Sequence, residues 1–341
     1  MDEAVLPEPL QGELRAAWHR YVDLTAPLRA DLHRYCRRLT GNVWDAEDLV
    51  QDTLLRAFSR LGHVHHEIRN PRAYLLRTAT HAWIDALRRR EADAKARESL
   101  EAAPATPAAS GAGELRDAGA ALLRWLAPQE RAALVLKDAF DFELAEIADV
   151  LATSVGAVKS ALHRGRGRLR EAGESGAASA RRPVPSPELV DRFVALYTAK
   201  DLAGLVSLML DGGSVENVGC GLEFGREAFE SRDGWFHHAV FGHPEWPAPF
   251  QYEAARLERA VYEGEPLVLG FTTRRGREAL EQVLRFEEQD GRIARLRGYA
   301  FCPETMREVA AALDLPVRTG LYRYPTPEPG KVYGTPTGAE S

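Results

Sequence analysis

The sequence predicts a multidomain chain in which two all-α helical domains, a helical bundle and then a helix-turn-helix, precede an α+β domain. Three observations support this prediction. Apolar residues recur at helical spacing through the first half of the chain. Two stretches rich in Ala, Pro, Gly and Ser interrupt that half. Alternation typical of strands begins only at 266–274.

The expected boundaries follow these changes in composition. We expect a bundle over 12–98, a linker over 99–113, a helix-turn-helix domain over 114–172, a linker over 173–186, an α+β domain over 187–314 and a Pro/Gly-rich tail over 315–341.

Composition limits the class of protein. The 341 residues are 45% hydrophobic, which permits two or three packed domains. The net charge of −6 gives no sign of nucleic-acid binding, so the clustering of basic residues matters more than their total. The three cysteines are far apart and odd in number, which favours a reducing cytosol over a disulfide framework.

Membrane association is not expected. Residues 1–11 contain three acids and no apolar core, so they do not resemble a signal peptide. No apolar run approaches the roughly 20 residues that span a bilayer. We therefore predict a cytoplasmic protein with no membrane partner.

The bundle is predicted from three apolar stripes at helical spacing, over 28–39, 46–61 and 75–87. Asn70-Pro71 is a helix-start signal before the third stripe.

In the α+β domain, the segment Asp211–Val215 resembles a loop and Asp290-Gly291 is a hairpin signal. The expected elements are helices over 187–210 and 226–240, strands over 266–274, 279–287 and 292–301, and a helix over 303–314.

The most specific motif is LAEIADVLATSVGAVKSALHRGRGRLR, residues 144–170. A helix-turn-helix needs a small residue where its helices cross, here Ala148, and apolar residues that pin them together. Ile147 and Leu151 pin the first helix, and Val158 and Leu162 pin the second. The hydroxyls of the intervening Ala-Thr-Ser turn can cap the second helix.

The outward side of that second helix would meet DNA, with polar residues toward base edges and basic ones toward phosphates. The alternative is a solvated helical face with a chance basic bias, but pinning pattern, turn and charge agree on DNA binding. The expected contacts are Ser154, Val155, Gly156, Lys159, Ser160, His163, Arg164 and Arg166.

Two further segments are ambiguous on charge alone. WDAEDLVQD, residues 44–52, is either an acidic helix start, favoured by the helix dipole, or a docking face for a basic partner. RAYLLRTATHAWIDALRRR, residues 72–90, mixes aromatic and basic side chains as single-stranded DNA requires. The alternative for this segment is a core Trp83 with a solvated basic end.

Together these segments identify a family. CRRLTGNVWDAEDLVQDTLLRAF and RNPRAYLLRTATHAWIDALRRR resemble the polymerase-binding and promoter-melting helices of extracytoplasmic-function sigma factors. LAPQERAALVLKDAFDFELAEIADVLATSVGAVKSALHRGRGRL resembles their C-terminal promoter-recognition domain. The resemblance covers about residues 12–172.

The resemblance implies roles for individual residues. The clamp helices of the polymerase β′ subunit would contact Asp45, Glu47, Asp48, Gln51 and Asp52. The −10 element would lie against Arg77, Thr80, His81, Arg88, Arg89 and Arg90. The helix-turn-helix face would recognise the −35 element. Many relatives carry Arg-Asn where this chain has Thr80-His81, and His81 can still stack on a base.

Residues 187–314 resemble a SnoaL-like domain, a cone-shaped α+β fold around a pocket. A regulatory role in cis is expected, with a small ligand as a candidate partner. The candidate pocket residues are Glu216, Asn217, His237, His238 and Tyr299.

The resulting hypothesis is a sigma factor that binds core RNA polymerase and promoter DNA, with no enzymatic activity, cofactor or metal. The histidines near 63–66 and 237–243 lack the convergent ligands that zinc requires. Two alternatives stay open: a helix-turn-helix regulator that acts without polymerase, and a SnoaL-type enzyme tethered to DNA.

Overall fold

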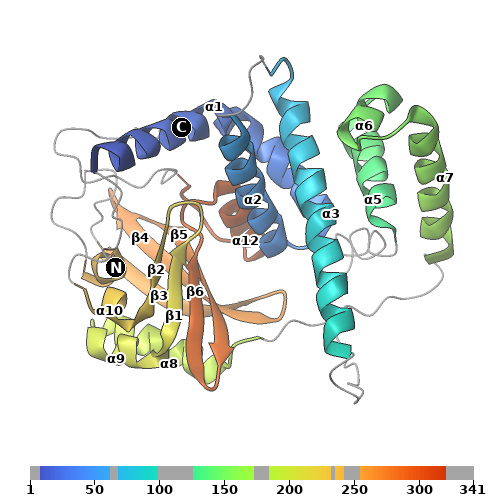
Figure 1. Ribbon diagram of the computed structural model, residues 1–341. Coiled ribbons are helices and arrows are strands. Elements are labelled where there is room, and N and C mark those ends of the chain that lie inside the picture. Colours follow the sequence, from blue (N-terminus) through green and yellow to red (C-terminus); the bar gives the residue numbers. More distant parts are fainter. Residues whose placement is uncertain are drawn as a thin grey trace. The chain divides into compact units, whose positions relative to one another are not determined.

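Figure 1 shows a computed structural model of the chain, coloured along the sequence. It describes residues 8–61, 68–98, 126–172, 184–231, 235–241 and 254–319. The predicted linker at 99–113, nearly all of the linker at 173–186 and most of the tail at 315–341 lie outside the described residues. Two units are distinguished, Met1–Ala180 and Arg181–Ser341, and each is described by itself.

The first unit opens with the predicted three-helix bundle, α1 (Glu8–Thr40), α2 (Val43–Leu61) and α3 (Pro71–Glu98). Gly41, with a φ of 85°, ends α1 because its left-handed backbone stops the helix. The Asn42 side chain then accepts a hydrogen bond from the amide of Asp45 and caps α2. The predicted helix start at Asn70-Pro71 is confirmed, because the Asn70 side chain accepts from the Ala73 amide.

The second half of this unit is the helix-turn-helix domain. It contains α5 (Pro128–Leu134), a π-helical turn η1 (Val135–Ala139), α6 (Leu144–Val150) and α7 (Val155–Ala172). α5 and α7 approach closely at Gly165, where an added Cβ would lie 2.7 Å from Leu134 Cδ1. A side chain at this position would require at least the Leu134 side chain to move.

The second unit is built on one mixed six-stranded sheet in the order β2-β1-β6-β5-β4-β3. Only the β1–β6 pair is parallel. The strands are β1 (Met209–Asn217), β2 (Gly221–Phe224), β3 (Ala254–Tyr262), β4 (Glu265–Arg274), β5 (Arg277–Gln289) and β6 (Arg292–Gly298). The helices are α8 (Pro187–Thr198), α9 (Leu202–Leu208), α10 (Gly225–Glu230), α11 (Trp235–Phe241) and α12 (Pro303–Ala312).

This architecture confirms the expected fold class, two helical domains followed by an α+β domain consistent with a SnoaL-like fold. α8 packs on β3 and β4, and its fully buried Phe193 meets Phe286 of β5 edge-on at 5.0 Å between ring centroids. The predicted strands at 266–274, 279–287 and 292–301 correspond to β4, β5 and β6.

Two details of this unit differ from the expectation. The segment Asp211–Val215 is not a loop but the middle of β1, whose pairing with β6 shifts register between Met209 and Ser214. The irregular pairing accommodates the glycines that had suggested a turn. The helix expected over 187–210 ends at Thr198, and a second one starts after the cap Asp201, whose carboxylate accepts from the Gly204 amide.

The core of the second unit can be tested at Phe193. Truncation to Ala removes an aromatic ring from a buried site and leaves a cavity, so Phe193→Ala should lower the free energy of unfolding by about 3–5 kcal/mol. Phe224, which is 66% exposed, is the matched control, and Phe224→Ala should change stability by no more than about 0.5 kcal/mol. Denaturant titrations of the full chain measure both, and equal losses would contradict the assignment of this core.

Candidate nucleic-acid and polymerase interface

The helix-turn-helix face is arranged as predicted. Val158 and Leu162 of α7 are buried, as are Ile147, Ala148 and Leu151 beside them. All eight predicted contact residues are exposed: Ser154, Val155, Gly156, Lys159, Ser160, His163, Arg164 and Arg166. Burial of one side of α7 therefore leaves the predicted DNA side open to solvent.

The turn between α6 and α7 fixes this orientation. The amide of Thr153 donates to the Ala148 carbonyl at 2.9 Å, and Ala152 has a φ of 50°, so α6 ends in a Schellman motif. The Ser154 hydroxyl accepts from the Ala157 amide at 3.2 Å and caps α7, as predicted from the Thr-Ser pair.

Ion pairs divide the basic residues of α7 into two groups. Glu130 of α5 is buried and binds Arg164 at 3.0 Å and Arg168 at 2.6 Å, while Asp138 binds Arg166 at 2.7 Å. Lys159 is exposed and pairs with no carboxylate among the described residues. Its charge is therefore the more available one for a phosphate.

The acidic residues of α2 differ in burial: three aspartates form an outer, partly exposed set, and Glu47 forms an inner, buried one. Asp45, Asp48 and Asp52 recur at spacings of three and four residues, which places them along one side of α2. The side chain of Asp52 is 43% exposed and pairs with Arg56, one turn further on. Asp45 is bonded to the Asn42 amide group.

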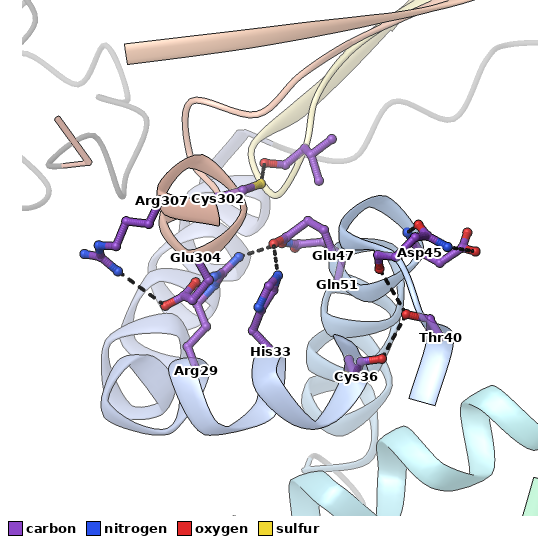
Figure 2. A network of polar contacts seen from close by, with 12 residues as sticks. Arg29, His33, Cys36, Thr40, Asp45, Glu47, Gln51, Cys302, Glu304 and Arg307 are labelled. Atoms are coloured by element: carbon purple, nitrogen blue, oxygen red, sulfur yellow. Dashed lines mark hydrogen bonds and ion pairs between the residues drawn. The ribbon is translucent and has the colours of Figure 1, made fainter. Parts of the chain in front are cut away.

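Glu47 belongs to the inner set. It is fully buried, and its carboxylate accepts hydrogen bonds from Arg29 at 2.5 Å and from Gln51 at 2.7 Å (Figure 2). His33 lies 4.0 Å from its other oxygen. Loss of one partner of such a buried pair costs about 3–5 kcal/mol, so Glu47 holds α2 on α1 rather than presenting its charge at the surface.

The predicted −10 residues on α3 are also not equivalent. Thr80 is fully buried, and its hydroxyl is bonded to the Leu76 carbonyl and to the Tyr35 hydroxyl, so it is closed to DNA in this structure. The arginines at 88–90 are exposed, and Arg90 lies 3.9 Å from Asp45 of α2. His81 is half-buried on the same helix.

Arg77 is engaged by the helix-turn-helix domain. It pairs with Asp149 of α6 at 2.8 Å. Nearby, the guanidinium of Arg72 lies over the rings of Phe140 and Phe142 at 5.5 and 5.1 Å. The conformation described therefore has α3 in contact with the second helical domain.

Sequence reasoning missed Arg131. This buried residue of α5 donates to the Leu39 carbonyl at the end of α1, at 2.7 Å, and lies over the Trp83 ring at 5.3 Å. The signal in the sequence is an arginine among the apolar residues of PQERAALVL, because a charge that is buried with them needs a partner.

Only some of the candidate pocket residues of the second unit line a cavity. Glu216 and Asn217 line a cavity beneath the sheet, but Glu216 is paired with Arg295 and Arg297 at 2.6 and 3.0 Å. Tyr299 is buried outside the cavity lining and bonded to Arg285. His237 is also absent from that lining, and the side chain of His238 is outside the described set.

Comparison with known proteins assigns the two helical domains. A family model for sigma-70 region 2 matches residues 24–92, and one for sigma-70 region 4 matches residues 120–169. The chain belongs to the sigma-70 family of RNA polymerase sigma factors, among the extracytoplasmic-function members.

Individual relatives agree with this family. The RNA polymerase sigma-E factor of Streptomyces coelicolor is 34% identical over 143 residues, 41% of this chain and 78% of the relative. The extracytoplasmic-function sigma factor SigG of Mycobacterium tuberculosis is 33% identical over 219 residues, 54% of this chain. The chain spans 57% of SigG, less than two thirds of its length.

A solved structure, that of the Mycobacterium tuberculosis extracytoplasmic-function sigma factor SigJ, is 24% identical to this chain. The match has a TM-score of 0.29 and covers 84% of this chain and 98% of that one. Within the described residues, no helix is long and apolar enough to cross a membrane.

His81 provides a pH-dependent test of the α3 surface. Burial, and secondly the positive charge of Arg77, lower the pKa of His81 below its usual 6.5. The unfolded chain therefore binds this proton at a higher pH than the folded chain does. Between the folded pKa and 6.5, His81 should make stability rise with pH and fall on acidification.

Two measurements check this expectation. An NMR titration of the His81 ring should give a midpoint below 6.5, and His81→Gln should flatten the pH dependence of unfolding in that range. A midpoint above 6.5 would show that His81 is solvated or paired with an acid.

Proposed function

We propose that this protein is an alternative sigma factor that binds core RNA polymerase and directs it to specific promoters. The observation that carries the proposal is the exposed face of α7, which carries polar and basic residues and is held outward by the buried side of the same helix. Such a face suits the major groove, where side chains meet base edges and phosphates. Its proposed target is the −35 element.

The acidic side of α2 is the proposed contact for the β′ clamp helices. Asp45, Asp48 and Asp52 are partly exposed and supply the charge, with Gln51 beside them, while the buried Glu47 positions the helix from within. The exposed arginines at 88–90 of α3, with Arg77 and His81, are the proposed −10 contacts. Thr80 supports that surface through its buried hydroxyl.

The C-terminal domain is proposed to tune transcription in cis through a small ligand, and the whole protein to act in the cytoplasm without catalysing a reaction. Sigma factors as a family are not enzymes. The pairing of Glu216 with two arginines disfavours its use as a general base, because its carboxylate is already engaged by Arg295 and Arg297. This supports sensing over the tethered-enzyme alternative.

Transcription in vitro tests the proposal directly. The full chain with core polymerase should give promoter-specific transcripts, and Asp48→Ala combined with Asp52→Ala should reduce core binding and transcript yield together. Both effects are expected because the double variant loses two negative charges that attract a basic partner. Glu227→Ala, at an exposed acid of the second unit, is the matched control and should leave both unchanged.

Absence of any promoter-specific transcript from the unaltered chain would favour a regulator that binds DNA without polymerase. If the double variant transcribes normally, the contact with the clamp helices lies elsewhere.

The affinity of α7 for DNA should depend on the salt concentration. For Lys159→Ala, the slope of log affinity against log salt should fall in magnitude by about 0.9, the value for one lost phosphate contact. Arg164→Ala should have a smaller effect, because Glu130 already neutralises part of that charge. Fluorescence anisotropy with a promoter duplex identified by transcript start mapping measures both.

Arg292→Ala, at an exposed basic residue of the second unit, serves as the control and should preserve the slope. An unchanged slope for Lys159→Ala would remove Lys159 from the phosphate contacts.

A further inference from the structure

The second unit contains a partly open cavity, here called the sheet cavity, of about 150 Å³. It lies between one face of the six-stranded sheet and helices α8 and α11. Its wall is mostly apolar and is formed by Phe193, Phe236, Leu257, Leu284 and Leu296, among other residues. A cavity of this volume can hold one molecule of about the size of benzene.

Two amide side chains interrupt this apolar wall at one place. Asn217 of β1 and Gly298 of β6 are register partners, and Gly298 also pairs with Leu284 of β5. A Cβ added at Gly298 would lie 2.6 Å from Asn217 Oδ1 and 2.9 Å from Gln282 Nε2. The missing side chain at Gly298 therefore lets both amides converge on one point of the wall.

The orientation of the Gln282 amide is fixed by the backbone. Its Oε1 accepts hydrogen bonds from the Tyr299 amide at 2.9 Å and from the Val283 amide at 3.1 Å. The NH₂ group is left as the free end, with no partner among the described residues. The amide group of Asn217 likewise bonds to none of the described residues.

Both residues are only partly buried, so a ligand in the cavity or water can satisfy these hydrogen-bonding groups. Together, the two amides supply donors and an acceptor, the combination that a carbonyl or carboxamide group complements.

The charged residues at the cavity are already compensated. Glu216 is bound by Arg295 and Arg297, and Arg256 is bound by Glu278 at 2.8 Å. A ligand with a net charge would lose its hydration without gaining a counterion, which is unfavourable. The electrostatics therefore favour a neutral ligand.

We infer that the sheet cavity binds one small neutral molecule, with an apolar body of about the size of a benzene ring and a carboxamide or carbonyl group held by Asn217 and Gln282. This inference deepens the proposed role of a ligand in the C-terminal domain and rests on that role for its biological meaning. Binding itself does not require polymerase or DNA.

The test uses three probes of the same shape on the full chain: benzamide, benzene and benzoate. Benzamide should bind at least tenfold more tightly than benzene, which lacks the polar group, and tenfold more tightly than benzoate, which is charged. Titration calorimetry gives the affinities, and NMR shifts of the Gly270 and Gly298 amides report whether the probe is in the cavity, since both residues line it.

Asn217→Leu replaces the amide by two methyl groups on the same branched framework without breaking a hydrogen bond to another described residue. It should weaken benzamide at least fivefold and leave benzene unchanged. Gln289→Leu, at an exposed glutamine of the same strand as Gln282, is the control and should affect neither. The comparison of probes on the unaltered chain needs no variant and stands if a variant fails to fold.

Benzamide that binds no better than benzene, or shifts of NMR signals elsewhere only, would overturn the inference. In-vitro transcription by the same preparation separates the two proposals. If it still gives promoter-specific transcripts, only the sheet-cavity proposal fails.

Discussion

The helical unit depends on the burial of one side of α7. Val158, Ala161, Leu162 and Gly165 follow the helical repeat and pack inward, with Leu134 of α5 close to Gly165. Since an α-helix has a fixed geometry, this packing determines which residues point to solvent, and those are the polar and basic ones. The proposed DNA face is thus a consequence of apolar packing rather than of the basic residues themselves.

Much of this could be predicted from the sequence, because helical signals are local. The spacing of apolar residues, the caps at Asn70 and Ser154 and the small residue at Ala148 each act over a few positions. The outer sides of α2 and α7 follow from them. It was harder to predict which polar residues of the bundle are buried. The burial of Glu47 and Thr80 depends on partners 18 and 45 residues away in the chain.

The sheet was less predictable for the same reason. β3 has a largely exposed burial pattern and lies at the edge of the sheet, where β4 is its hydrogen-bonded neighbour, so its sequence lacks clear alternation. β1 contains adjacent glycines that resemble a turn, and its place beside β6 is set by pairing with a strand some 80 residues later. The sheet cavity arises from these long-range pairings, and only Glu216 and Asn217 among its lining residues were anticipated.

The buried carboxylate of Glu47 also affects how this surface can be exchanged between relatives. Its charge is neutralised by Arg29, a residue of another helix. A chimera that transplants α2 alone separates Glu47 from Arg29, and a buried carboxylate without this partner would destabilise the helix that carries the neighbouring acids. An exchange between relatives should therefore move α1 and α2 together, so that Arg29 and Glu47 stay paired.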